Sequence, residues 1–411
     1  MAHVAFCIAP FTGHVNPSLA VVSELTRRGH RVSYATTAEF SARARAAGGH
    51  VAAYETTTLM PPGGRTVRRD PGHGDFARAC RGQLRELEAV APVLIAAFGD
   101  DVPDVVVCDP MNWVGLVLAA RWQVPPINSV TSMISDVRWS LGPVATSFRL
   151  DDPVLPLLLA AVSAALARYR TGLTADQLLG AGSGTPVVAY YPRAFQSRGD
   201  QFGPHVRFVG PCLRYRPDAV SRGSAGHGRP WRPPGDGPVV LVSLGTVVNR
   251  QPELFRRCID AFAELDCQVV AALGGLDATD LGSLPANVQA HTYLPLVQVM
   301  PYADVLVGHG GMTSTMEALS HGVPVAAMPQ MPEQRINADR LAELGLGVCL
   351  EVAQQTEEAL RASVAELMQD VNVGPRLDWM RAEIERAPGA PAAAEVIENA
   401  TQGCHNGRQL A

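Results

Sequence analysis

The sequence predicts an α/β protein with two doubly wound domains, in which helices cover both faces of each parallel sheet. Short runs of Val, Ala and Leu recur along the chain, and helical patterns separate them. Strands that are apolar throughout, without alternating polar residues, are typical of parallel sheets buried on both faces. The chain has 411 residues, which suits two domains of the usual size.

The apolar runs indicate nine strands, and the patterns between them indicate helices such as 17–28 and 252–264. We expect strands at 3–8, 31–36, 104–108, 125–130, 187–191, 238–244, 268–273, 304–308 and 323–328. The stretch 213–237 is rich in Pro, Gly, Arg and Ser and has little to bury, which is typical of an interdomain linker. The predicted organisation is a first domain at 1–212, this linker, a second domain at 238–385, and a helix or tail at 386–411.

The composition excludes several partners and cofactors. The chain has 34 Lys and Arg against 39 Asp and Glu and no basic stripe, so we expect no nucleic acid partner. It contains no Lys, which excludes a pyridoxal phosphate Schiff base and a Walker-type phosphate loop. The N-terminus lacks a basic region before its apolar run, and the apolar run at 153–168 is too short to cross a bilayer. We therefore expect a cytoplasmic protein without stable membrane insertion.

The segment 307–337, VGHGGMTSTMEALSHGVPVAAMPQMPEQRIN, has the pattern of a phosphate site. A buried strand runs into His309 and two glycines, and a helix follows them. Backbone N–H groups at a helix start are unpaired and carry partial positive charge, and glycines let a ligand approach the backbone. Glu317, Glu333 and Gln334 lie farther along and suit hydroxyl groups. A nucleotide sugar has both a diphosphate and hydroxyl groups, so the segment predicts a nucleotide-sugar site.

A second candidate site lies in the first domain, where His14 and Asp109 each follow a predicted strand. Because ligands of open α/β sheets bind at the carboxyl ends of the strands, two strand ends could bring these residues together. A His–Asp pair makes a general base, with the carboxylate fixing the tautomer. We expect Asn16 to cap the following helix and Pro17 to be its first residue. An ordinary turn histidine, and an aspartate that caps a helix or pairs with an Arg, remain alternative interpretations.

Other signals are weaker. Ser243, Gly245 and Thr246 end the first strand of the second domain, where they suit a diphosphate contact or a plain tight turn. Tyr293 stands at another strand end and could stack on a nucleobase, although core packing is the commoner fate of an aromatic residue. No G-x-G-x-x-G follows the first strand, which argues against a cofactor dehydrogenase.

Two long motifs give the chain a specific resemblance to a known family. The motifs GHVNPSLAVVSELTRRGHRVSYAT and GHGGMTSTMEALSHGVPVAAMPQMPEQRINADRLAELGLG resemble those of GT-B glycosyltransferases of family 1, in particular the bacterial macrolide-type UDP-glycosyltransferases. The likeness covers nearly the full length. It implies a GT-B fold, in which two Rossmann-like domains face each other across a cleft. The first domain would bind the acceptor and the second the nucleotide sugar.

The resemblance also implies a role for each matching residue. His14 would deprotonate the acceptor hydroxyl, with Asp109 as its partner. The implied contacts with the diphosphate are His309, Gly311, Thr313 and Ser314. Glu317 would bind both ribose hydroxyls, and Glu333 and Gln334 would bind the sugar. Tyr293 stands in place of the usual Trp and would stack on the base. Thr131 or Ser132 would reach the sugar. Leu296 stands where many members have Gln, and Glu333 where Asp is more frequent.

The expected reaction is inverting transfer of a hexose from a UDP-sugar to a hydroxyl of a hydrophobic acceptor, which would be a macrolide, a polyketide or a phenol. The Glu333–Gln334 pair suits a fully hydroxylated hexose such as glucose. A carboxylate that accepts from both hydroxyls of a cis-diol favours ribose, so Glu317 indicates UDP. The helix start would stabilise the leaving diphosphate, and we expect no metal or other cofactor. The alternatives are a dTDP-deoxysugar transferase in antibiotic assembly, a sugar-nucleotide epimerase on the same fold, and a non-catalytic protein that retains the fold.

The acceptor residues are the least sharply predicted part of the site. Segments 55–85 and 131–180 should line the acceptor pocket as loops of the first domain. The candidate apolar contacts are Met60, Met111, Trp113, Met133, Trp139 and Phe148, with core packing as the alternative for each. The identity of the acceptor stays open, and the sequence is compatible with a monomer or a homodimer.

Overall fold

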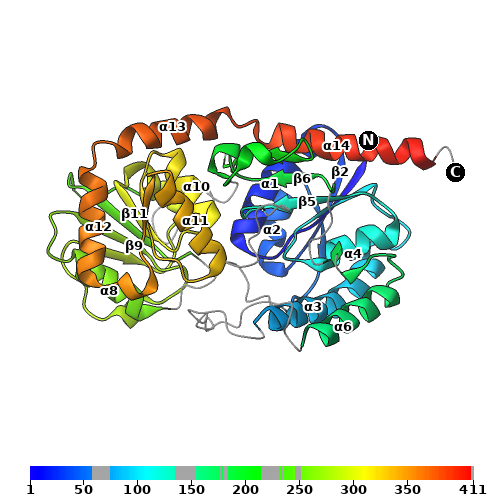
Figure 1. The fold of residues 1–411 in the computed structure, drawn as a ribbon, viewed down its shortest axis with the longest axis horizontal. Coiled ribbons are helices and arrows are strands. Elements are labelled where there is room, and N and C mark those ends of the chain that lie inside the picture. The colour runs from blue at the N-terminus through cyan, green and yellow to red at the C-terminus, as the bar shows by residue number, and fades with distance from the viewer. Residues whose placement is uncertain are drawn as a thin grey trace.

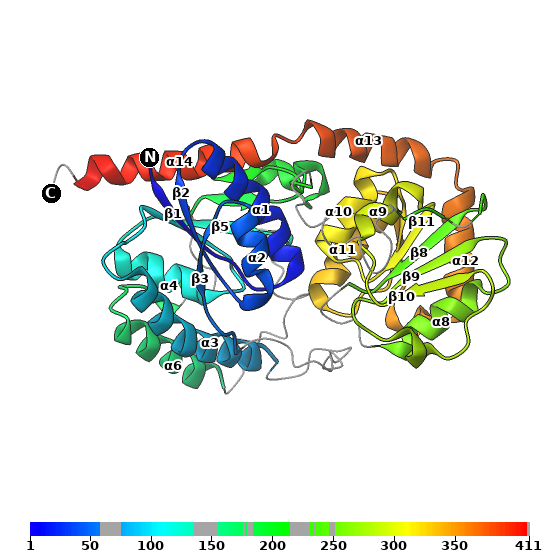
Figure 2. The same ribbon diagram turned by 180° about the vertical axis from the view of Figure 1, so that it is seen from behind.

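The protein forms two α/β lobes, shown as a ribbon in Figure 1 and from behind in Figure 2. The computed structural model describes residues 1–57, 75–134, 154–175, 177–178, 184–213, 231–233, 235–245 and 251–408. Most of the predicted linker at 213–237 lies outside these described residues.

The first lobe contains a seven-stranded sheet in the order β3-β2-β1-β4-β5-β6-β7, and all its strand pairs are parallel. The strands are β1 His3–Cys7, β2 Arg31–Thr36, β3 His50–Ala53, β4 Val105–Cys108, β5 Pro126–Val130, β6 Val187–Ala189 and β7 Val206–Phe208. The helices are α1 Thr12–Arg27, α2 Ala38–Ala46, α3 Asp75–Phe98, α4 Trp113–Trp122 and α6 Leu155–Arg168.

Helices cover both faces of this sheet. Along β1, Ala5 and Cys7 belong to the hydrophobic cluster that includes residues of α3, α4 and α6. Val4 and Phe6 belong to a second cluster, on the side of α1 and α2. Because every side chain of the central strands is buried on one face or the other, these strands read as unbroken apolar runs in the sequence.

The second lobe contains a six-stranded parallel sheet in the order β10-β9-β8-β11-β12-β13. The strands are β8 Val239–Ser243, β9 Gln268–Ala272, β10 Val288–His291, β11 Val305–Gly308, β12 Val325–Ala327 and β13 Gly347–Cys349. The helices are α8 Pro252–Phe262, α9 Leu296–Val299, α10 Met312–Ser320, α11 Pro332–Glu343, α12 Glu357–Gln369 and α13 Val373–Arg386.

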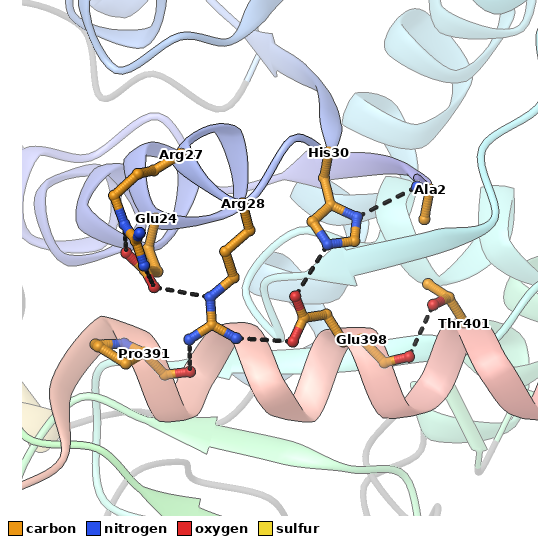
Figure 3. A network of polar contacts seen from close by, with 8 residues as sticks. All are labelled: Ala2, Glu24, Arg27, Arg28, His30, Pro391, Glu398 and Thr401. Carbon is orange, nitrogen blue, oxygen red and sulfur yellow. Dashed lines mark hydrogen bonds and ion pairs between the residues drawn. The ribbon is translucent and has the colours of Figure 1, made fainter.

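The last helix, α14 Gly389–Arg408, leaves the second lobe and lies along the first (Figures 1 and 2). Its residues Ala393 and Ile397 join the core cluster of β1 and α1. Figure 3 shows the polar contacts beside this core: Glu398 accepts from Arg28 Nη1 at 2.8 Å and contacts His30 Nε2 at 3.0 Å. Helix α14 therefore completes the first lobe.

The predicted fold class is confirmed, and all nine predicted strands are present with ends that differ by at most two residues. The predicted start of the first helix is wrong. Helix α1 begins at Thr12, and Pro17 lies inside it, so Asn16 does not cap it. The N–H of Val15 already bonds to the Phe11 carbonyl at 2.9 Å, which closes a helical turn before Pro17 is reached.

No helix in the described part of the chain combines the length and apolar character needed to cross a membrane. Residues 155–168 of the apolar run form α6, which packs against α3.

Candidate active site

The structure brings His14 and Asp109 into direct contact. His14 lies in the first turn of α1, and Asp109 follows β4, the neighbour of β1 in the sheet. The distance from His14 Nδ1 to Asp109 Oδ2 is 2.7 Å. The Asp109 carboxylate also accepts from the backbone N–H of Met111 at 2.8 Å and of Ala9 at 3.3 Å. These bonds fix the carboxylate, which in turn fixes the imidazole ring.

The environment of His14 favours its protonated form. Burial opposes the charge, but the charge and hydrogen bond of Asp109, with a smaller contribution from Glu333, raise the pKa of His14 above its usual value. Because Asp109 takes up Nδ1, the other ring nitrogen, Nε2, can accept a proton. Thr131 Oγ1 lies 3.2 Å from His14 Nδ1, so this residue contacts the predicted base directly.

The turn between β11 and α10 holds His309 in a very different environment. The ring packs between Gly245 and Gly311, where a Cβ on either glycine would collide with it. Burial lowers the pKa of His309 to about 4, with a small opposing effect from the Ser243 backbone. His309 is therefore neutral at pH 7. The first turn of α10 has no side-chain cap on its N–H groups, as an anion site at a helix start requires.

The residues predicted to bind ribose and sugar lie on α10 and α11. Glu317 is only 4% exposed. Glu333 lies in the first turn of α11, and burial raises the pKa of its carboxyl, although the Asn337 hydrogen bond and His14 oppose the shift. Gln334 Oε1 accepts from the N–H groups of Gln330 and Met331 at 2.8 and 3.1 Å. The side-chain oxygen of Gln334 thus caps the start of α11, and its side-chain amide nitrogen is the group that could reach a sugar.

The two lobes meet at these residues. Thr313 Oγ1, on α10, donates to the Gly13 carbonyl of α1 at 3.0 Å. Arg340, on α11, donates to the carbonyls of Ala194 and Phe195 in the first lobe, both at 3.0 Å. The charge of Glu333 acts on the pKa of His14. The carboxyl ends of β1 and β11 therefore face each other, and the two predicted half-sites form one site.

The remaining donor candidates are less informative. Ser243 is 5% exposed, at the end of β8, and Gly245 packs on the His309 ring. Ser314 Oγ donates to the Gly311 carbonyl at 3.0 Å, within the first turn of α10. Tyr293 is 49% exposed and so is not a core residue. Thr246 lies outside the described residues.

The structure separates the acceptor candidates. Trp113 and Met133 are 7% and 2% exposed and belong to hydrophobic cores, so they pack inside the protein instead of lining a pocket. Met111 is 50% exposed and immediately follows the Asp109 turn, which suits contact with an acceptor. Met60, Trp139 and Phe148 lie outside the described residues.

Sequence reasoning missed Asn337 and Arg340. Asn337 is fully buried, and its Nδ2 donates to the Gly310 carbonyl at 2.9 Å and to Glu333 Oε1 at 2.8 Å. It lies one turn after Glu333, and Arg340 lies nearly one turn after Asn337. A polar residue at this helical spacing from Glu333 was the available signal. Among the described residues, no cluster of three His, Cys, Asp or Glu side chains could hold a metal ion.

Comparison with known proteins supports a sugar-transfer site. The family model described as "Erythromycin biosynthesis protein CIII-like, C-terminal domain" matches residues 256–402. Demethyllactenocin mycarosyltransferase of Streptomyces fradiae is 40% identical, over 97% of this chain and 86% of the relative. Oleandomycin glycosyltransferase of Streptomyces antibioticus is 31% identical, over 97% of this chain and 90% of the relative.

Solved structures agree with the sequence comparison. The crystal structure of the calicheamicin glycosyltransferase CalG4 is 31% identical with a TM-score of 0.79, and the match covers 97% of this chain and 98% of that one. The structure of the kitacinnamycin glycosyltransferase gives 30% identity and a TM-score of 0.80, with the same coverage.

The fold and the site thus define a GT-B glycosyltransferase. The chain belongs to the glycosyltransferases of macrolide and antibiotic type. The predicted family and enzyme class are confirmed, and the epimerase and the non-catalytic protein are set aside.

Proposed function

We propose that the enzyme transfers a hexose from UDP-glucose, with inversion, to a hydroxyl of a hydrophobic small molecule such as a macrolide, polyketide or phenol. The observation that carries this proposal is the 2.7 Å contact between His14 Nδ1 and Asp109 Oδ2, at a point where the second lobe presents Glu333 and α10. A general base and a helix start that suits a diphosphate are the two groups that the reaction needs.

The reaction follows from this geometry. His14 Nε2 takes the proton of the acceptor hydroxyl as its oxygen attacks the anomeric carbon. The bond from that carbon to the diphosphate oxygen breaks on the opposite face, so the configuration inverts. The Asp109 carboxylate stabilises the imidazolium that forms. The N–H groups at the start of α10 stabilise the charge on the leaving nucleoside diphosphate, so we propose that no metal is required.

The donor is inferred from two carboxylates. Glu317 is buried on α10, and a carboxylate there suits the two hydroxyls of a ribose. Glu333 and the amide nitrogen of Gln334 suit a sugar with several hydroxyl groups. Tyr293 is half exposed, and a side chain must be accessible in this way if it is to stack on a nucleobase.

A dTDP-deoxysugar is the second candidate donor. The observation in its favour is the 40% identity to a mycarosyltransferase, since mycarose is a deoxysugar. An NDP-glycosyltransferase of Bacillus subtilis is 32% identical over 96% of this chain, and its name specifies neither one nucleotide base nor one sugar.

A mass-spectrometric screen tests both candidates. UDP-glucose and dTDP-glucose are offered with a panel of macrolides, polyketides and flavonoids, with and without a chelator. We expect a hexose adduct with UDP-glucose that survives chelation. An adduct with dTDP-glucose alone would favour the second candidate, and strict dependence on added metal would contradict the proposed mechanism.

A further inference from the structure

Pro17 lies inside α1, in its second turn. A proline has no N–H and cannot donate to the carbonyl four residues earlier, which here belongs to Gly13. In a helix, a proline ring also crowds that carbonyl and favours a tilt away from the helix axis. The Gly13 carbonyl, directly before His14, therefore lacks the hydrogen bond that a helix would normally give it.

The missing donor comes from the other lobe. Thr313 Oγ1, in the first turn of α10, donates to the Gly13 carbonyl at 3.0 Å. The approach is close, since a Cβ on Gly13 would lie 3.3 Å from Thr313 Oγ1. The two helix starts that carry the base and the proposed diphosphate site are thus joined by this one bond, one residue from His14.

We infer that Pro17 and Thr313 are positioning residues, which act through the Gly13 carbonyl to hold His14 in register with the donor site. The inference rests on the proposed function, because it assigns roles in the same reaction. It also gives Thr313 a different role from the diphosphate contact that the family resemblance implies.

The hydroxyl of Thr313 cannot fill both roles at once. A threonine hydroxyl has a single O–H to donate, and the oxygens of a diphosphate can only accept. A hydroxyl that donates to Gly13 has no hydrogen left for the diphosphate. Removing the hydroxyl therefore affects different quantities in the two cases: His14 alignment in one, and nucleotide affinity in the other.

The first experiment compares Thr313→Val with Thr313→Ser in the full chain. The affinities for UDP and dTDP are measured by calorimetry. The kcat is measured with the donor and acceptor that the wild-type enzyme uses in the mass-spectrometric screen. We expect Thr313→Val to lower kcat by about 3–10-fold, as for one lost hydrogen bond, and Thr313→Ser to retain more activity. Nucleotide affinity should stay within about twofold of wild type. A fall in nucleotide affinity as large as the fall in kcat, or an unchanged kcat, would overturn the inference.

The second experiment uses Pro17→Ala, which changes no side chain proposed to touch the donor. Alanine restores the N–H, which can donate to the Gly13 carbonyl and compete with Thr313 for it. We expect a higher melting temperature together with a kcat that is about 2–5-fold lower. The matched control is Pro92→Ala, because Pro92 is also inside a helix, α3, but is exposed. Pro92→Ala should leave kcat unchanged. Equal kcat values for the two variants would contradict the role of Pro17.

The wild-type protein separates a failure of this inference from a failure of the proposed function. If the wild type binds neither UDP nor dTDP, the proposed function fails, and the inference fails with it. If the wild type binds one of them and transfers the sugar while all variants behave alike, the proposed function stands and the inference alone is overturned.

Discussion

Two histidines at corresponding places in the two lobes have opposite environments. His14 lies at the start of α1, after β1, and His309 lies just before α10, after β11. The Asp109 carboxylate raises the pKa of His14 in spite of burial, whereas burial between glycines lowers the pKa of His309 to about 4. The same side chain is thus prepared to take up a proton in one lobe and to remain neutral in the other.

This difference shows that the position after a strand does not by itself determine chemistry. The carboxylate neighbour suits His14 to the proposed role of a base, while burial keeps His309 neutral, so that it could donate a hydrogen bond to an anion without carrying charge. Only the residues that contact each ring distinguish the two roles.

The largest expected effect comes from removing the base. His14→Ala should lower transfer by about 10²–10⁴-fold, the usual contribution of a general base. The affinity for UDP or dTDP should remain, because the proposed nucleotide site lies in the other lobe. Product formation is measured by mass spectrometry and nucleotide affinity by calorimetry. His50→Ala, an exposed change on β3, is the control. Unchanged transfer in His14→Ala would remove His14 from the mechanism.

Asp109→Asn should have the next largest effect. The imidazole stays in place but loses its charged partner, so we expect kcat/KM to fall by about 10²-fold. The wild-type rate should rise with pH through the raised pKa of His14, because the neutral ring is the base. In the variant this rise should move to lower pH, since the attraction that raised the pKa is gone. A rate–pH profile measures both effects.

The control for the pH profile is Asp101→Asn, which removes an exposed carboxylate of the first lobe that pairs with Arg31. We expect no change in its profile. A profile of Asp109→Asn that keeps the wild-type midpoint would contradict the pairing as the cause of the shift.

The central strands were predictable from the sequence, but the sheet edges were not. The four strands that the sequence did not indicate, β3, β7, β10 and β13, are the outermost strands of the two sheets. Each is three or four residues long, and all have partly or fully exposed residues. An edge strand has a neighbour on one side only, so it can be short and polar, and it leaves no apolar run.

The site residues that belong to a sequence motif were predictable. The residues whose burial depends on tertiary packing were less so. The contact of His14 with Asp109 follows from two strand ends, as expected. The burial of Trp113 and Met133 depends on how helices and loops fold over the sheet, which the sequence does not show. Pro17 misled the prediction of the helix start, because prolines favour first helical positions, whereas this one lies in the second turn, four residues after the Gly13 carbonyl that accepts from Thr313.

A smaller effect is expected at Asn337, which connects the turn at Gly310 with Glu333. Asn337→Ala removes a hydrogen bond to a partly buried carboxylate, so kcat/KM for the donor should fall by about 10-fold. The variant should lose affinity for the sugar part of the donor and keep its affinity for the nucleotide part. Calorimetry should therefore show weaker binding of UDP-glucose and little change in the binding of UDP. Asp339→Asn is the control, since Asp339 lies on the same helix and pairs with Arg335 at the surface. Equal losses for UDP and UDP-glucose would show that the whole helix is disturbed.

The last expected effect is on stability and not on catalysis, and it comes from neutral His309. The pKa of this group is about 4 in the folded protein and about 6.5 in an unfolded chain. The unfolded state therefore binds more protons between these values, and the stability is full above pH 6.5 and lost as the pH falls towards 4. His309→Asn should flatten the dependence of the unfolding free energy on pH in this window by at most about 1.4 kcal/mol per pH unit. Urea denaturation at several pH values measures it, with exposed His50→Asn as the control. An unchanged slope would mean that His309 takes up its proton in the folded state, and the contrast with His14 would then lie in orientation and not in charge.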